Sequence, residues 1–166
     1  MKNSILTAVL LFTLAASAFS QTFTGDQKQS LKGLNALLLM VEFTEAATVE
    51  ADGLKKDELE TAIAARLRSS GIRLLSQTEW SSTPGVPYLQ VLVNTLKSDL
   101  GFYSYKIDVQ LNQEIVLKRN NIAMMSTTWN KGALGHIGTT RVPAIRNDIM
   151  GYVNEFIQDY RAVNAN

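Results

Sequence analysis

The sequence contains no cysteine among its 166 residues. This absence excludes a disulfide framework, a thiol nucleophile and a zinc site built from thiolates. It also excludes lipid attachment by the bacterial lipoprotein route, which needs a cysteine directly after the signal sequence. A domain of this length can bury a sizeable core, so it does not require covalent cross-links to fold.

Histidine is almost absent as well, since His136 is the single one. One histidine cannot build a multi-histidine metal site, although it can act as a general base. His136 lies in the stretch Lys131-Gly132-Ala133-Leu134-Gly135-His136-Ile137-Gly138, with no nucleophile or carboxylate near it in sequence. We interpret it as a surface loop residue, and we predict no metal site, no catalytic residue and no cofactor.

The chain also lacks an excess of charge. It has 16 basic and 15 acidic residues, and Lys2 is the single charge in the first twenty positions, so 15 of each sign remain beyond them. A neutral balance gives no case for nucleic acid as a partner, and none for long-range attraction to an anionic membrane.

The first twenty residues have the order of a secretory signal peptide. One charge, at Lys2, precedes a mostly apolar run from Ile5 to Leu14, and small residues follow at Ala15-Ala16-Ser17-Ala18. The run is too short for a comfortable membrane span, and no comparable run occurs later. We predict a periplasmic or secreted protein with no transmembrane segment after processing. Its parts are a signal peptide at 1–20, a flexible lead-in at 21–33 and one domain at 34–166.

Five segments have the composition or alternation of strands. The first, residues 34–43, is almost continuously apolar and is predicted to be an interior strand buried on both faces. The clearest alternation runs from Tyr103 to Leu117, which is far longer than a usual strand and must bend, bulge or project past its neighbours. The remaining three segments are 72–77, 88–97 and 122–129.

Two segments have the periodicity of amphipathic helices. The first runs from Asp52-Gly53 to about Ser70, with Asp52 as the predicted cap and Gly71 as the left-handed stop. The second begins near Pro143. The apolar stripes are Leu59, Ala62, Ile63 and Leu67 in the first helix, and Ile145, Ile149, Val153, Phe156 or Ile157, and Tyr160 in the second.

This order of elements predicts a two-layer α+β fold. We expect a mixed, largely antiparallel sheet of about five strands with two helices packed on one face. The polar side of the long strand, with Lys106, Asp108, Gln110 and Asn112, then faces solvent or a partner. A solvated face is the ordinary interpretation, and a binding surface or an edge for strand pairing is the alternative.

Residues 131–140 are rich in glycine and lie between the last strand and the last helix. The spacing of Gly132, Gly135 and Gly138 matches neither the dinucleotide fingerprint nor the Walker pattern. We predict a flexible strand-to-helix connection, which could also form a mobile flap over a ligand.

Aromatic residues suggest a second candidate site. A hairpin turn at 119–121 that pairs Lys118 with Ile122 places Trp129 opposite Leu111. The glycine loop would then fold between Trp129 and two tyrosines, Tyr103 and Tyr105, with His136 beside them. Such a cluster could bind a sugar, a peptide or an apolar ligand, although the commoner interpretation is the rim of the core.

Several stretches resemble a group of uncharacterised exported bacterial proteins. They are Gly53-Leu54, Leu67-Arg68 with Gly71-Ile72, Pro87-Tyr88-Leu89-Gln90-Val91 and Thr127-Thr128-Trp129. The element order is also similar to small envelope modules such as the amino-terminal domain of TolB and the lipopolysaccharide-assembly lipoproteins. The resemblance implies an envelope location and supplies no catalytic residue.

Three functions remain open from the sequence. The leading hypothesis is an exported binding or assembly module without catalysis, with an envelope protein as partner. The second is a small-ligand or glycan binder that uses the aromatic residues near Trp129, and the third is a hydrolase of unfamiliar type.

Overall fold

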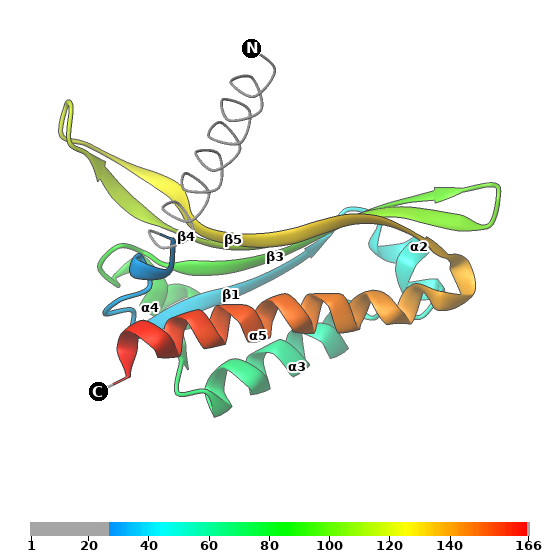
Figure 1. Ribbon diagram of the computed structural model, residues 1–166, viewed down its shortest axis with the longest axis horizontal. Coiled ribbons are helices and arrows are strands. Elements are labelled where there is room, and N and C mark those ends of the chain that lie inside the picture. Colours follow the sequence, from blue (N-terminus) through cyan, green and yellow to red (C-terminus); the bar gives the residue numbers. More distant parts are fainter. Residues whose placement is uncertain (1–26, 166) are drawn as a thin grey trace, which may run out of the picture.

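The computed structural model describes residues 27–165 and has two layers (Figure 1). One layer is a five-stranded sheet, and the other is formed by α3 (Lys56–Ser69) and α5 (Ile145–Asn164), which both lie on the same face of the sheet. The two-layer α+β fold predicted from the sequence is therefore confirmed. The predicted signal peptide, residues 1–20, lies outside the described residues.

The sheet has the order β2-β1-β3-β4-β5. Its strands are β1 (Ala36–Phe43), β2 (Arg73–Leu74), β3 (Tyr88–Ser98), β4 (Phe102–Leu117) and β5 (Ile122–Gly138). β1 is parallel to β2 and to β3, whereas β3, β4 and β5 form an antiparallel meander. Three of the five predicted strands, at 34–43, 88–97 and 103–117, match these elements to within about two residues at each end.

The first strand is less enclosed than its apolar sequence predicts. β2 pairs only with Ala36 and Leu37, so most of β1 lacks a neighbour on that side among the described residues. Leu37 and Val41 are buried against the helices, while the residues between them are half-buried. Burial on both faces was expected, but the two long helices α3 and α5 cover only one face of β1.

The predicted strand at 72–77 is mostly wrong. Only Arg73 and Leu74 pair with β1, and Gln77 instead begins α4 (Gln77–Ser81). A capping box favours the helix, because the Ser76 side chain accepts from the Glu79 backbone and the Glu79 carboxylate accepts from the Ser76 backbone at 2.9 Å.

The first predicted helix has a later start than expected. α3 begins at Lys56, and a separate short helix, α2 (Ala46–Ala51), precedes it. Asp52 does not cap α3, since its carboxylate bonds Lys97 and Tyr103 instead. The predicted stop is confirmed: Gly71 has φ +85°, and the Ile72 backbone N–H donates to the Leu67 carbonyl at 3.1 Å, as in a Schellman motif.

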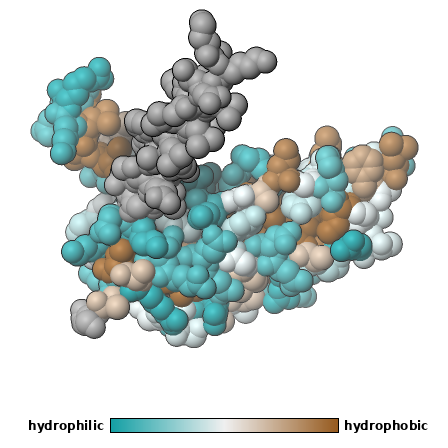
Figure 2. Space-filling model, in the orientation of Figure 1, coloured by the Kyte–Doolittle hydropathy of each residue, from teal (hydrophilic) through white to brown (hydrophobic). Residues whose placement is uncertain are grey.

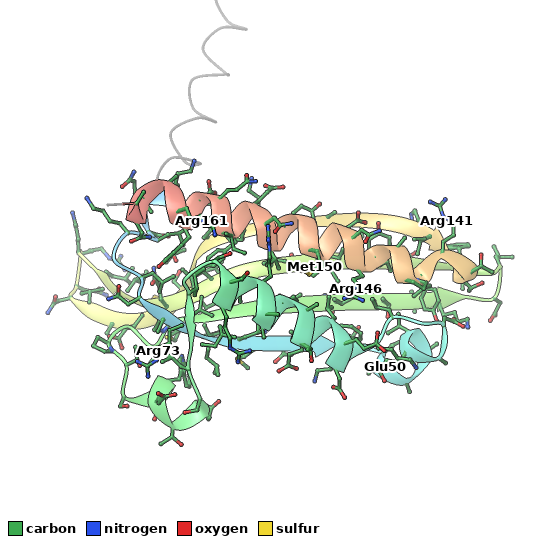
Figure 3. The ribbon with its side chains drawn as sticks, turned by 90° about the horizontal axis from the view of Figure 1, so that it is seen from below. Glu50, Arg73, Arg141, Arg146, Met150 and Arg161 are labelled. Carbon is green, nitrogen blue, oxygen red and sulfur yellow. The ribbon has the colours of Figure 1, made fainter. Side chains whose placement is uncertain are left out.

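The helix faces were predicted correctly except at Ala62, which is half-buried, whereas Ala64 is buried in its place. Leu59, Ile63 and Leu67 of α3 are fully buried, as are Ile145, Ile149, Val153 and Phe156 of α5. The two helices run side by side beneath the sheet, as seen from below in Figure 3. A 3₁₀ helix, η1 (Thr139–Ala144), contains Pro143 and leads directly into α5.

Part of the predicted flexible lead-in is held against the core. Leu31 is fully buried, and its carbonyl accepts a hydrogen bond from the Asn164 side chain at 2.8 Å. Asn164 also accepts from the Gly33 backbone at 2.7 Å. These contacts attach residues 31–33 to the end of α5, which sequence periodicity could not reveal because the partners are about 130 positions apart.

The predicted glycine-rich loop is wrong, because β5 continues through it as far as Gly138. Gly132 lies opposite Asp108 and Gly135 lies opposite Tyr105. A Cβ atom at Gly132 would lie 2.2 Å from the Ile107 carbonyl oxygen, and one at Gly135 would lie 2.9 Å from the Tyr105 ring. The glycines therefore permit close packing inside a paired strand, and they form neither a phosphate loop nor a flap.

A bulge sets the register of the two longest strands. The turn pairs Leu117 with Ile122, one residue away from the predicted pairing of Lys118 with Ile122. The register then shifts between Leu111 and Asn112, where Thr128 is the extra residue on β5. This shift compensates for the first, so that Trp129 lies opposite Leu111 as predicted.

We expect Leu67→Ala and Ile149→Ala each to lower the free energy of unfolding by about 2–5 kcal/mol, because both remove fully buried side chains. Arg146→Ala, at an exposed position of α5, should change it by less than about 0.5 kcal/mol. Urea unfolding followed by circular dichroism measures all three, and equal small effects would contradict the assigned helix faces.

We also expect Gly132→Ala to destabilise the protein by about 1–3 kcal/mol, since the added methyl group meets backbone that cannot move aside cheaply. Gly138→Ala is the matched control in the same strand, because a Cβ there meets no heavy atom within 4 Å. The same unfolding experiment compares the two variants. A tolerated Gly132→Ala would favour the loop interpretation over the strand.

Candidate functional site

The candidate partner-binding residues lie on the sheet face away from α3 and α5. Alternation along β4 directs Tyr103, Ile107, Val109 and Leu111 to the helices and therefore directs Lys106, Asp108 and Gln110 to the opposite face. Lys106 Nζ lies 2.9 Å from Asp108 Oδ2, so this pair is already engaged within the chain. Figure 1 shows α3 and α5 on the other face, while the short α4 reaches this one, where Trp80 meets Tyr88 edge-on at 6.0 Å. We call this face the helix-free face because neither α3 nor α5 covers it.

Asn112 differs from its three neighbours because it is only 7% exposed. Its Oδ1 accepts a hydrogen bond from Thr127 Oγ1 at 2.7 Å, whereas its Nδ2 has no partner among the described residues. Asn112 follows the register shift directly, where β4 and β5 begin to separate from the rest of the sheet. Its amide therefore supports the hairpin more directly than it offers a free contact.

The helix-free face is not uniformly polar. The register places Leu38, Tyr88 and Asn112 in one row across β1, β3 and β4, and Met40, Gln90 and Gln110 in the next. Leu38, Met40 and Tyr88 are half-buried there. Gln90 Nε2 also donates to Glu42 Oε2 at 2.9 Å. The surface thus mixes aliphatic and paired polar groups, which is a composition suited to protein contact.

The aromatic residues of the second candidate site are not brought together. Trp129 is 1% exposed, packs edge-on against Phe156 and donates from Nε1 to Asp159 Oδ2 at 3.0 Å. Tyr103 lies eight residues along β4 from Leu111, the partner of Trp129, which corresponds to roughly 26 Å of extended strand. The glycine-rich segment pairs with β4 and does not fold between them.

Both tyrosines support the helix layer. Tyr103 is fully buried, and its hydroxyl donates to Asp52 Oδ2 at 2.7 Å. The Tyr105 hydroxyl donates to Asp148 Oδ2 of α5 at 3.2 Å. Burial raises the pKa of both phenols, and the neighbouring carboxylates Asp52 and Asp148 raise them further. Neither phenol is therefore poised as a base near neutral pH.

His136 lies on β5 as an exposed residue of the helix-free face. Its Nδ1 is 3.0 Å from Ser104 Oγ, its cross-strand partner, and its ring meets Phe102 edge-on at 5.8 Å. No carboxylate is hydrogen-bonded to the imidazole among the described residues. A serine and a histidine on an open strand face lack the orienting acid and enclosed oxyanion site of a hydrolase.

A groove of about 540 Å³ lies at the start of β1, away from all the predicted sites. Its walls include Arg73, Glu79, Pro84 and Gln113. Arg73 and Glu79 form an ion pair across it, and the pKa of Glu79 is lowered chiefly by the Ser76 backbone N–H, then by the Ser76 hydroxyl and Arg73. Arg73 and Glu79 therefore satisfy each other, whereas Lys32, which also lines the groove, is exposed and makes no ion pair among the described residues.

The sequence did not identify the most exposed apolar residues. Beyond the last β3–β4 pair, Tyr88–Asn112, the β4–β5 hairpin continues alone as a projecting arm, residues 113–126. It extends five residues past that pair, or roughly 17 Å. The arm exposes Val116, Ile122, Met124 and Met125. The unusual length of the 103–117 alternation was the signal for it.

A second apolar region lies at the other end of the sheet. We define the β3–β4 end as residues 96–102 together with Leu134 of β5. Leu96, Leu100 and Leu134 are 64%, 84% and 77% exposed, and a shallow hollow of about 180 Å³ is lined by Leu96, Leu134 and neighbouring residues. Figure 2 shows brown surface at this end, on the right, and on the arm at upper left behind its teal tip.

Comparisons with known proteins identify only distant likenesses. No family model and no curated protein matches the chain. Among solved structures, a PelC dodecamer from Paraburkholderia phytofirmans has 14% identity and a TM-score of 0.39, with 76% of this chain and 90% of that chain covered. A minor lipoprotein from Acinetobacter baumannii has 17% identity and a TM-score of 0.33, with 78% and 94% covered.

A third neighbour is a putative neuraminyllactose-binding hemagglutinin homolog from Helicobacter pylori, with 13% identity, a TM-score of 0.32, and 81% and 88% covered. Likenesses this distant carry no argument about function. Within residues 27–165, no helix is both long and apolar enough to cross a membrane, and no three acidic or histidine side chains group as a metal site would require.

The Asp52 contacts generate a pH prediction. Hydrogen bonds from Lys97 and then Tyr103 lower the pKa of Asp52 from its ordinary 3.8. A carboxylate with a lowered folded-state pKa stabilises the fold above its unfolded-state pKa, and that contribution is lost as the pH falls through the folded-state value. We therefore expect Asp52→Asn to lower the Tm at pH 7 and the difference from wild type to shrink below about pH 3.8. Glu114→Gln, on the exposed arm, is the control and should show neither effect.

Proposed function

We propose that this protein is an exported, non-catalytic assembly module that acts by binding another protein. The observation that carries the proposal is the arm, which holds Val116, Ile122 and Met124 in solvent at 55%, 54% and 46% exposure. Large aliphatic side chains scattered singly on a surface need no explanation, but a cluster on a projecting hairpin is typical of an interaction site.

The form of the arm favours a protein partner. A two-stranded ribbon is marginally stable alone in water, so contact with a partner would stabilise it. Its apolar side chains lie along the strands, while its tip is polar, with Lys118, Arg119, Asn120 and Asn121. A tip of this kind resists insertion into hydrocarbon, because burying its charges is costly. The strand sides can still pack against another protein.

The helix-free face is the second candidate surface for the same function. Lys106, Asp108 and Gln110 line it, with Asn112 at its border with the arm. Because Lys106 and Asp108 are paired with each other, a partner there would have to compete with or join that ion pair. A partner that binds the apolar side chains of the arm does not have to compete with an ion pair, so we place the principal contact on the arm.

The alternative functions have weaker support. A small-ligand or glycan site at Trp129, Tyr103, Tyr105 and His136 would need aromatic faces open to solvent, but Trp129 and Tyr103 are in the core. An unfamiliar hydrolase would need an enclosed site around His136, which is exposed on a strand. Location in the periplasm or outside the cell is part of the proposal and rests on the sequence of residues 1–20.

The proposal predicts that capture of a partner depends on the arm. Tagged mature protein, cross-linked in envelope extract, should lose its captured partner when Ile122→Ser is combined with Met124→Ser. The Tm should change little, because both residues are exposed. The control exchanges the charges, Lys106→Asp with Asp108→Lys, and so keeps the ion pair of the other surface.

Retained capture by the arm variant, with loss in the charge-exchange variant, would move the contact to the helix-free face. Retained capture in both variants would contradict a role for either surface.

A further inference from the structure

We infer that the partner of the arm is a second copy of this chain, which receives it at the β3–β4 end. The inference rests on the proposed function, since it names the protein that the binding module binds. It starts from the placement of the exposed large apolar residues. Four lie on the arm, and the other three lie at the β3–β4 end. None of the described large apolar residues exposed to this degree lies between them.

Placement at two opposite ends determines the kind of association that would bury both regions. Figure 1 shows the arm and the β3–β4 turn at opposite ends of the same sheet. One copy cannot bring its own two ends together, because a paired sheet joins them. Head-to-tail contact between copies covers both regions with a single repeated interface, and it produces a ring or an open chain.

The shapes of the two regions are complementary. The arm is a narrow ribbon with Ile122 and Met124 on one side and Val116 and Met125 on the other, as the alternation and the cross-strand pairs require. The β3–β4 end offers a hollow of about 180 Å³ between Leu96 and Leu134. This hollow can accept large aliphatic side chains, and the ribbon presents such side chains on both faces.

Charge favours the head-to-tail arrangement over a symmetric one. The arm turn carries Lys118 and Arg119, both exposed and without an ion pair among the described residues. Contact between two arms through their turns would bring four positive charges together, which is unfavourable. The one acidic residue of the arm, Glu114, lies nearer its base. The β3–β4 turn carries Asp99, while Lys97 beside it is already neutralised by Asp52 at 2.7 Å. The two turns therefore have opposite free charges.

The experiment uses two variants that each lack one half of the interface. The arm variant combines Ile122→Ser with Met124→Ser, and the end variant combines Leu96→Ser with Leu134→Ser. Analytical ultracentrifugation of the purified mature protein, over a concentration series, measures the mass of each. We expect wild type to assemble beyond a monomer, and each variant alone to need at least tenfold more protein to associate. Asn130→Ser, exposed on β5 between the two ends, is the matched control and should assemble like wild type.

Mixing the two variants gives the decisive result. The end variant keeps an intact arm and the arm variant keeps an intact receiving end, so the mixture should form a 1:1 dimer and nothing larger. An end variant that associates as wild type does would show arm-to-arm contact and overturn the inference. A mixture that stays monomeric, or a wild type that is monomeric throughout, would also overturn it. The capture experiment tests the proposed function separately. If the arm captured a different envelope protein, the proposed function would stand even though self-association had failed.

A charge pair provides a test that does not depend on the serine variants folding. Lys118→Glu with Arg119→Glu changes only exposed turn residues and should raise the dissociation constant of assembly severalfold. Mixing this variant with Asp99→Lys should restore association, because the opposite charges face each other again. Failure of the mixture to associate more tightly than either variant alone would contradict the assigned contact.

Discussion

The extra residue at Thr128 is the constraint on which the rest of the structure depends. The turn at 118–121 fixes a register that, without a shift, would set Thr128 opposite Leu111 and direct Trp129 away from the helices. The bulge moves Trp129 to the helix side, where it packs on Phe156 and bonds Asp159. Asp159 also pairs with Lys28 at 2.9 Å, so the same bulge helps to attach the beginning of the described chain to α5.

The bulge also divides the β4–β5 hairpin into two parts with different roles. On one side of the bulge, β4 is paired with both β3 and β5. There one face of β4 packs against the helices and the other points away from them. On the other side, beyond Asn112, the described hydrogen bonds of β4 and β5 to the rest of the chain are those of Glu114 with Gly85 and of the Gln113 side chain with the Ser30 carbonyl. Aliphatic residues there face solvent on both sides of the ribbon, because no third strand or helix covers them among the described residues. This exposed hairpin is the feature on which the proposed contact with another protein rests.

The same sheet explains why the residues with familiar catalytic side chains are poor candidates for chemistry. His136 and Ser104 face each other because antiparallel pairing places them opposite, and they lie on an open surface. Tyr103, Tyr105 and Asp52 are engaged in the contacts that join β4 to α2, the following turn and α5. Their hydrogen bonds hold the sheet and the helix layer together, so these side chains are not free to act on a ligand. The exposed apolar residues lie elsewhere, at the two ends of the sheet.

The sequence by itself determined the elements whose signal is local. Local spacing predicts which side chains share a face. It does so through the two-residue alternation of 103–117 and through the helical spacing of Leu59, Ile63 and Leu67. Gly71 predicts where α3 ends, because few other residues readily adopt the left-handed backbone conformation found there. Tertiary structure alone decided the role of Gly132 and Gly135, since glycine indicates a loop unless a neighbouring strand needs the space of the missing side chain. It also decided the burial of Trp129 and the exposure of Ile122 and Met124, because both depend on which strands end first and where the register shifts, and neither property is encoded within a few residues of the chain.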